Sequence, residues 1–253
     1  MKIIETANAA ELGKSAGKLA AQLIRSAIEK NGQANIILAT GTSQFETLSQ
    51  LIKEAIDWNK VVMFHLDEYI GLPKSSPASF RRYLQERFLA KVPPLKEVYL
   101  VNGETDASAE CERLSAFIKK NPIDVALVGI GENGHLGFND PPANFETDTP
   151  FIVVDLDTAC RKQQFGEGWF ATIDDVPRQA ITMSIKQIIK SKKIICSVPD
   201  LRKAQAVKDC VERAVSNLFP ASILQLHDDC TCYLDSFSAS LLFRENIESA
   251  QSR

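Results

Sequence analysis

Short apolar segments alternate with stretches of helical spacing along most of the chain, and this alternation constrains the fold more than any other feature. The clearest apolar segment is IDVALVGIG (123–131), a continuous run typical of a strand that is buried on both faces. Strands that alternate with helices in this way pair in parallel, and their helices cover both faces of the sheet. The sequence therefore predicts an α/β fold, with a doubly wound, mostly parallel sheet in a Rossmann-like three-layer sandwich.

The expected elements follow one another without a linker, a repeat or a low-complexity stretch, which predicts one domain over residues 1–253. Other strands are expected at 34–40, 61–66, 98–101, 192–198 and 230–234, with the last of them closing the sheet. Helices are expected at 11–29, 44–58, 79–92, 107–119, 185–191 and 200–217.

The composition excludes binding by bulk charge. With 29 Lys+Arg and 32 Asp+Glu the net charge is −3, too balanced for a protein that holds nucleic acid or an anionic membrane by its overall charge. The chain lacks an apolar run of about 18 residues and the pattern of a secretory signal. Its six cysteines are scattered without a CxxC pair, which favours reduced, mostly buried thiols. We expect a soluble, cytoplasmic protein that binds neither nucleic acid nor membranes.

Ligands of such folds bind outside the carboxyl ends of the strands, so the residues that follow the strands are the candidates for a site. Thr40, Gly41, Thr42 and Ser43 end the first of these strands and lead into a helix. They match neither the Walker loop nor the GxGxxG pattern, but small residues there let backbone N–H groups hold a phosphate. A plain helix N-cap is the alternative. Lys203, near the start of a later helix, is either a second phosphate contact or a solvated cation.

Two adjacent carboxylates, Asp67 and Glu68, follow the second strand. Neighbouring side chains point in different directions, so these two are not expected to act as a pair. One of them could enter the cleft as a general base while the other packs or caps a helix. A solvated acidic turn is the alternative reading.

A glycine-rich loop at 129–141 follows the clearest strand. Four glycines lie between 129 and 137, more than a strand-to-helix connection needs, which indicates a backbone shaped around a ligand. His135 lies among them, close enough to Asp140 for the carboxylate to orient the imidazole for proton transfer. A purely structural histidine is the alternative. His65, within a strand, and His227, after SILQL, are expected to be structural.

Together these segments resemble the glucosamine-6-phosphate deaminase/isomerase family, which is related to the 6-phosphogluconolactonases. The resemblance covers most of the chain. It rests on LDEYIGLP (66–73), GIGENGHLGFNDP (129–141), KAQAV (203–207) and SILQLH (222–227), which occur in the expected order. It implies a single domain of this type and a sugar phosphate as the partner. Because the family includes monomers and hexamers, a homo-oligomer remains open.

The resemblance also implies aldose–ketose chemistry. Asp67 would take the C2 proton of the sugar, and His135 would move a proton at the ring oxygen while the ring opens. Protonation at C1 would give a ketose imine, whose hydrolysis releases ammonia. The 40–43 loop and Lys203 would hold the phosphate, and no metal or organic cofactor is implied for this step.

Three positions depart from the pattern of the deaminases. They carry an acid where this chain has Asn133, and usually a glutamate where it has Asp140. They also have a substrate-binding arginine near Gln164, for which Arg161 or Lys162 could substitute. Another hexosamine phosphate, such as galactosamine 6-phosphate, and isomerisation without deamination therefore stay open.

The sequence thus predicts an amino-sugar-phosphate isomerase or deaminase. It would convert glucosamine 6-phosphate, or a related hexosamine 6-phosphate, to a ketose 6-phosphate with release of ammonia. A hydrolase of the 6-phosphogluconolactonase type and a non-catalytic sugar-phosphate-binding protein are the alternatives.

Overall fold

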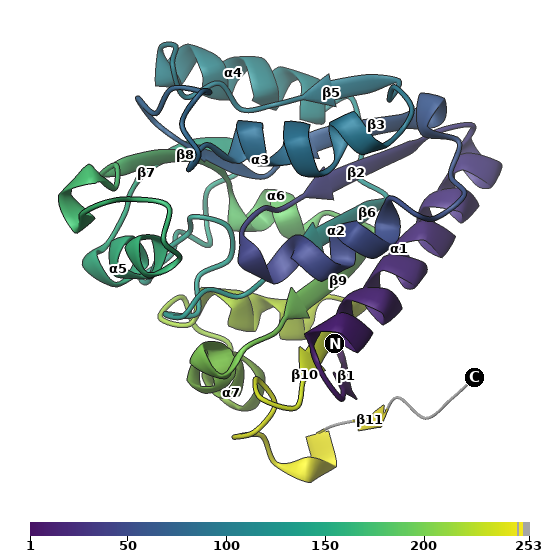
Figure 1. The fold of residues 1–253 in the computed structure, drawn as a ribbon, viewed down its shortest axis with the longest axis vertical. Coiled ribbons are helices and arrows are strands. Elements are labelled where there is room, and N and C mark those ends of the chain that lie inside the picture. The colour runs from purple at the N-terminus through teal and green to yellow at the C-terminus, as the bar shows by residue number, and fades with distance from the viewer. Residues whose placement is uncertain (247, 250–253) are drawn as a thin grey trace.

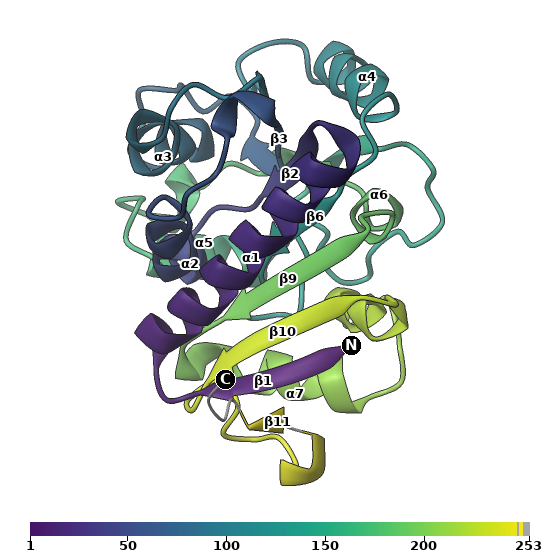
Figure 2. The ribbon, with the colours of Figure 1, turned by 90° about the vertical axis from the view of Figure 1, so that its right-hand side faces the viewer.

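A central parallel sheet with helices on both faces organises the computed structural model (Figures 1 and 2). The structure describes residues 1–246 and 248–249. Over these residues the sheet has eight strands in the order β11-β1-β10-β9-β6-β2-β3-β5, and each recorded pairing is parallel. The predicted three-layer α/β fold is confirmed.

The strands of this sheet are β1 (Lys2–Thr6), β2 (Ala34–Leu38), β3 (Val61–His65), β5 (Glu97–Tyr99), β6 (Val125–Val128), β9 (Lys193–Val198), β10 (Cys230–Asp235) and β11 (Glu248–Ser249). The helices are α1 (Ala9–Asn31), α2 (Phe45–Leu51), α3 (Phe80–Arg87), α4 (Ala107–Ile118), α5 (Thr158–Gly166), α6 (Ile185–Ile189) and α7 (Ala204–Glu212). A small antiparallel sheet contains β4 (Asp67–Tyr69), β8 (Gln179–Met183) and β7 (Phe151–Asp155), in that order.

Two apolar cores hold the layers together, one on each face of the large sheet. Helices α1, α2 and α3 pack on one face, and α4, α6 and α7 pack on the other. Helix α1 illustrates why the sequence folds this way, since Leu12, Ala20 and Ile24 recur at helical spacing and are buried against the sheet. Asn8 caps its first turn, and Gly32 ends it in the left-handed conformation at φ 77°. Figure 2 shows this helix crossing the sheet.

Helix α3 ends at Arg87, earlier than expected, and a short 3₁₀ turn over Leu89–Lys91 follows it. Two other predicted helices also end early. Helix α2 stops at Leu51, because Trp58 turns inward to pack edge-on against Phe88, with ring centroids 5.3 Å apart. Helix α7 stops at Glu212, after which the chain is extended and the carbonyl of Asn217 accepts a hydrogen bond from Ala143 at 2.9 Å. In both places a long-range contact overrides the local helical pattern.

The edge of the sheet also differs from the prediction. Strand β10 does not close the sheet, because the N-terminal strand β1 pairs with its outer edge and β11 pairs with β1. The small antiparallel sheet was not predicted either. Its strands β7 and β8 bring residues 151–183 to the carboxyl edge of the large sheet, where β4 continues the chain after β3.

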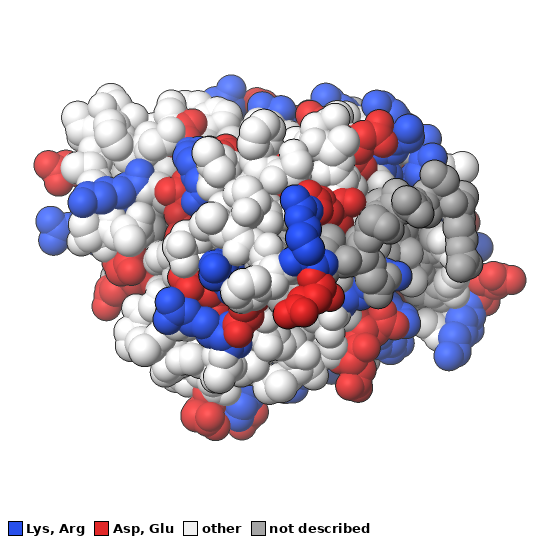
Figure 3. All heavy atoms as spheres, turned by 90° about the horizontal axis from the view of Figure 1, so that it is seen from below, with Lys and Arg blue, Asp and Glu red and all other residues white. Residues whose placement is uncertain are grey.

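The expected burial of the cysteines is confirmed, since all six are buried and unpaired. Over the described residues, none of the helices combines the length and apolar character needed to cross a membrane. On the face seen in Figure 3, positive and negative side chains are intermixed, in agreement with the balanced net charge of −3.

Candidate active site

The carboxyl ends of four adjacent strands, β9, β6, β2 and β3, open into one pocket. Their loops bring together residues that lie more than 150 positions apart in the sequence. The pocket is lined by Ala39, Thr40, Gly41, Thr42, Ser43, Leu66, Asp67, Phe80, Gly129, Ile130, Gly131, His135, Gly137, Phe138, Gln163, Gln164, Glu167 and Lys203. Predicted candidates therefore meet here from each of the four strand ends.

Asp67 enters the pocket from the first position of β4, with only 5% of its surface exposed. The pKa of its carboxyl group is raised to about 8, chiefly by burial and secondly by the charge of Glu68, while a hydrogen bond from the backbone N–H of Phe138 opposes the shift. A carboxylate with a raised pKa is a stronger base than an exposed one. The glycine loop approaches it closely, since a Cβ at Gly137 would lie 3.3 Å from Oδ2 of Asp67.

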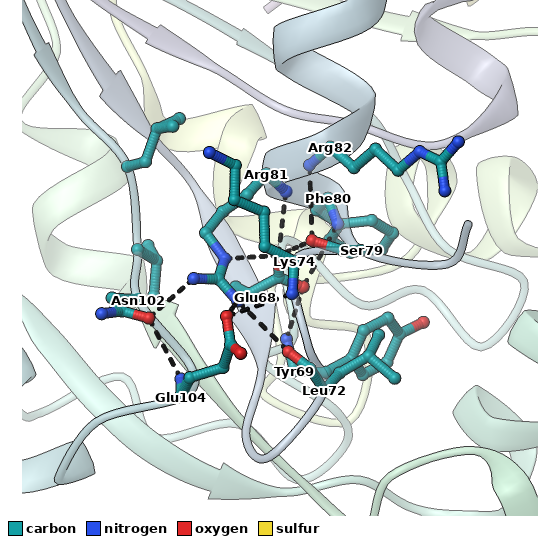
Figure 4. Close-up of polar contacts among 12 residues, drawn as sticks. Glu68, Tyr69, Leu72, Lys74, Ser79, Phe80, Arg81, Arg82, Asn102 and Glu104 are labelled. Atoms are coloured by element: carbon teal, nitrogen blue, oxygen red, sulfur yellow. Dashed lines mark hydrogen bonds and ion pairs between the residues drawn. The ribbon is translucent and has the colours of Figure 1, made fainter. Parts of the chain in front are cut away.

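Glu68 does not line this pocket and is fully buried, with its carboxylate among the residues that begin α3 (Figure 4). Its carboxylate accepts hydrogen bonds from the backbone N–H groups of Tyr69 at 3.0 Å, Phe80 at 3.2 Å and Arg81 at 2.8 Å. The hydroxyl of Ser79 also donates to it, at 2.8 Å. Three of these four donors belong to the start of α3, so Glu68 caps that helix while Asp67 enters the cleft. The predicted division between the two carboxylates is confirmed, and neither lies in a solvated turn.

Arg81 ties this buried carboxylate to the loops around it (Figure 4). Its Nε lies 3.4 Å from Glu68, and its other nitrogens donate to Asn102 at 2.6 Å, Glu104 at 2.8 Å and the carbonyl of Leu72 at 3.2 Å. A guanidinium group can hold several acceptors in a fixed geometry. The segment that carries the candidate base is therefore held by charged and polar contacts on the side away from the pocket.

His135 lies on the opposite wall, 8% exposed, with its Nδ1 3.2 Å from Oδ1 of Asp140. The two atoms are close enough for an ion pair, although the ring orientation does not meet the geometry of a hydrogen bond. Gly131 leaves room for the ring, because a Cβ there would lie 2.1 Å from Nε2 of His135. Residue 131 must therefore lack a Cβ atom for the ring of His135 to occupy this position.

Asp140 lies behind His135 and does not line the pocket itself. It accepts hydrogen bonds from the amide of Asn133 and from the backbone N–H of Asp157, both at 3.0 Å. Burial alone would raise the pKa of Asp140, but the contacts with His135, Asn133 and Asp157 hold it below its usual value. The carboxylate facing His135 is therefore charged at neutral pH.

The predicted phosphate loop lines the pocket from the end of β2. Gly41 adopts φ 90°, a left-handed conformation that glycine tolerates, and its carbonyl accepts a hydrogen bond from Tyr83 at 3.1 Å. Lys203 reaches the same pocket and is 6% exposed. Burial lowers the pKa of its ammonium group, and over the described residues it makes no ion pair. A buried cation without an ion pair suits an anionic ligand.

Helix α5 supplies a wall that sequence reasoning missed. Gln163, Gln164 and Glu167 line the pocket from this helix. The side chain of Gln164 accepts a hydrogen bond from the hydroxyl of Tyr69 at 2.7 Å, and that of Gln163 accepts one from the N–H of Glu132 at 2.7 Å. The spacing of these positions was the available sign, but the strand before α5 is β7 of the small antiparallel sheet, which was not predicted from the sequence.

Arg161 does not line the pocket, contrary to the expectation that it could substitute for the substrate-binding arginine of the deaminases. Its guanidinium group donates to the carbonyl of Ile173 at 2.6 Å and to that of Val176 at 3.2 Å, so it holds the following turn in place. Lys162 is exposed and does not line the pocket. Both are therefore left out of the site that we propose.

One group of potential metal ligands lies beside the pocket. The ligand atoms of His135, Asp140 and Cys160 are within 4.8 Å of one another. Burial raises the pKa of the Cys160 thiol far above its usual range, and the charge of Asp140 and a hydrogen bond to it act in the same direction. A protonated thiol is a hydrogen-bond donor and a poor metal ligand. We therefore describe the three residues as a largely buried polar cluster.

Comparison with known proteins gives a consistent family. Residues 7–233 match the family model described as glucosamine-6-phosphate isomerases/6-phosphogluconolactonase. A glucosamine-6-phosphate deaminase of Listeria monocytogenes is 39% identical over 245 residues, 96% of this chain and 100% of the relative. One from Lactobacillus delbrueckii subsp. bulgaricus is 37% identical over 243 residues, again 96% of this chain and 100% of the relative.

Solved structures agree with the fold. A monomeric glucosamine-6-phosphate deaminase superposes with a TM-score of 0.86 at 34% identity, covering 96% of this chain and 100% of that one. A 6-phosphogluconolactonase from Thermotoga maritima gives a TM-score of 0.76 at 16% identity, covering 92% of this chain and 98% of that one. At that identity the second likeness concerns the fold alone.

Proposed function

The chain belongs to the glucosamine-6-phosphate isomerase/6-phosphogluconolactonase family, and from this premise we propose that it is an amino-sugar-phosphate isomerase and deaminase. It converts glucosamine 6-phosphate, or a related hexosamine 6-phosphate, to a ketose 6-phosphate and ammonia. The observation that carries the proposal is the placement of Asp67, a buried carboxyl group with a pKa raised to about 8, in one pocket with His135 and Lys203. A C2 proton is weakly acidic, and its removal needs a strong base held close to it.

The reaction begins with opening of the sugar ring. His135 moves a proton at the ring oxygen, while the charged carboxylate of Asp140 holds its imidazole and balances the positive charge that forms there. Neutral imidazole accepts a proton and imidazolium returns it, so one residue serves both directions. The open-chain aldehyde then has a C2–H bond next to its carbonyl group.

Asp67 removes the C2 proton, and the electrons of that C–H bond form a double bond between C1 and C2. The electron pair of the carbonyl group moves to the C1 oxygen, which takes a proton from water, and the product is an enolamine. With a pKa of about 8, Asp67 keeps this proton near neutral pH and can return it to the substrate at C1. Protonation at C1 gives a ketose imine, and water adds to the imine carbon. Loss of ammonia from that adduct leaves the ketose 6-phosphate.

The phosphate is held at the other end of the pocket. The 40–43 loop offers its backbone N–H groups and the side-chain hydroxyls of Thr40, Thr42 and Ser43. Lys203 supplies the positive charge. We treat residues 1–253 as one domain that acts in the cytoplasm on a small sugar phosphate.

The test is a comparison of three substrates with three separate readouts. Purified protein is incubated with glucosamine 6-phosphate, galactosamine 6-phosphate and 6-phosphogluconolactone, and ammonia, ketose phosphate and free acid are each measured. We expect equal amounts of ammonia and ketose phosphate from one hexosamine phosphate. Acid from the lactone with neither product from either amino sugar would overturn the proposal in favour of the hydrolase, and binding without any product would favour the non-catalytic alternative.

A further inference from the structure

The side-chain amide of Asn133 lies between the carboxylates of Asp140 and Asp157, and each of its polar atoms makes a hydrogen bond. Its Nδ2 donates to Oδ1 of Asp140 at 3.0 Å and to Oδ2 of Asp157 at 3.3 Å. Its Oδ1 accepts the backbone N–H of His135 at 3.1 Å. Both amide hydrogens and the carbonyl oxygen are therefore engaged, and each contact leads toward His135 or toward the residue that faces it.

Asp157 is joined to this group by a second route. Its own backbone N–H donates to Oδ2 of Asp140 at 3.0 Å, so that both oxygens of Asp140 are fixed from outside the pocket. Its other carboxylate oxygen caps helix α5 by accepting the N–H of Cys160 at 2.6 Å. Since α5 carries Gln163 and Gln164 into the pocket, Asp157 connects that wall to the loop that holds His135.

The charges explain why an amide is suitable at position 133. Asp140 is held ionised, and Asp157 accepts only N–H donors in the described part of the chain. A carboxylate in place of Asn133 would lie within hydrogen-bond distance of both Asp140 and Asp157, and one of the three acidic groups would have to take a proton. Besides Asp140, the other carboxylate of this cluster is therefore that of Asp157. Asn133 connects it to His135, because it donates to Asp157 and accepts from the backbone N–H of His135.

We propose that Asp157 is a positioning residue that acts through Asn133 to fix the His135–Asp140 pair. The proposal rests on the proposed function only for its activity readout. The contacts predict that positions 133 and 157 are coupled: an acid at 133 is harmful while Asp157 is present, and it becomes tolerable once residue 157 is neutral.

A double-mutant cycle tests this coupling. Asn133→Asp, Asp157→Asn and the double variant are compared for kcat, KM and the pH profile of kcat/KM, and for urea unfolding between pH 5 and 8. Asp157→Ser is the matched variant, because serine still caps α5 but cannot reach Asn133 with a carboxylate. Asp155→Asn, an exposed change in the preceding strand, is the control for loss of a charge.

We expect Asn133→Asp to lower kcat, and to lower the urea midpoint more at pH 8 than at pH 5, because the proton shared by three carboxylates is lost as the pH rises. The double variant should recover kcat by about 5- to 100-fold over Asn133→Asp, the usual range for contacting residues. Asp157→Ser should lower kcat and alter its pH profile, with KM almost unchanged. Additive effects of the two positions on the urea midpoint would overturn the proposal.

The two readouts separate this proposal from the proposed function. If the protein acts on none of the three substrates, the urea cycle still decides whether positions 133 and 157 are coupled. Recovery of the urea midpoint in the double variant would then support the coupling without the proposed reaction. Additive midpoints would refute the coupling whatever the activity.

Discussion

Asp67→Asn removes the carboxyl group at the centre of the proposed chemistry, and the structure predicts its effect on stability as well as on turnover. The folded chain gives Asp67 a pKa of about 8, against an ordinary value of 3.8 for an exposed aspartate. Between these values the folded state keeps a proton that the unfolded state has lost, so the free energy of unfolding falls as the pH rises through this range. At about 1.4 kcal/mol per pH unit, the ionisable group destabilises the fold by up to about 5 kcal/mol near pH 8.

Asparagine has nearly the same shape and no charge at any of these pH values. The variant should therefore gain free energy of unfolding relative to the native chain, and the gain should grow by up to about 1.4 kcal/mol for each pH unit between 5 and 8. Urea unfolding at four pH values measures it, and turnover should fall by about 10²- to 10⁴-fold. Asp155→Asn, which removes an exposed carboxylate, should show no such growth. A difference between Asp67→Asn and the native chain that stays constant over this range would refute the reasoning.

Three further substitutions probe the surroundings of the base. Glu68→Gln removes a charge that raises the pKa of Asp67, so the acid limb of the kcat/KM profile should move to lower pH. The same change removes a buried carboxylate that is fully hydrogen-bonded, so the urea midpoint should also fall. Lys203→Met should raise KM for a phosphorylated substrate by about 10- to 100-fold and weaken inhibition by inorganic phosphate to a similar extent. Arg161→Ala is the matched control for that change, with KM expected within about twofold of the native value in steady-state assays. Gly131→Ala should displace the ring of His135 and lower kcat by about 10-fold or more, with KM almost unchanged in steady-state kinetics. An unaltered kcat would show that the ring does not need the space left by the glycine.

The fold could be predicted because its central strands carry a strong local pattern. The continuous apolar run that contains β6 and the helical spacing of α1 each specify one element without help from distant residues. The missed parts depend on contacts between distant segments. Strand β1 is five residues long and is defined by its pairing with β10, at the other end of the chain. The end of α2 depends on Trp58 packing against Phe88, which no local pattern reports.

The candidate site also contains residues that a local pattern predicts and residues that depend on contacts between distant segments. Asp67 and His135 follow strands directly, so the rule that ligands bind at the carboxyl ends of strands was enough to place them. Helix α5 reaches the pocket only because the small antiparallel sheet folds back on the large one, and its Gln163 and Glu167 could not be found by that rule. Arg161 was offered as a substitute for the substrate-binding arginine of the deaminases, whereas two carbonyl groups of the following turn hold it elsewhere.

The central claim is that Asp67 removes the C2 proton of a hexosamine 6-phosphate. Proton NMR in D₂O measures this directly, by following the C2–H signal of the substrate together with the signals of the ketose phosphate. The native chain should lose the C2–H signal as ketose phosphate and ammonia appear, and Asp67→Asn should bind the substrate while losing that signal at least about 100-fold more slowly. Loss of the C2–H signal at the native rate in Asp67→Asn would contradict the account.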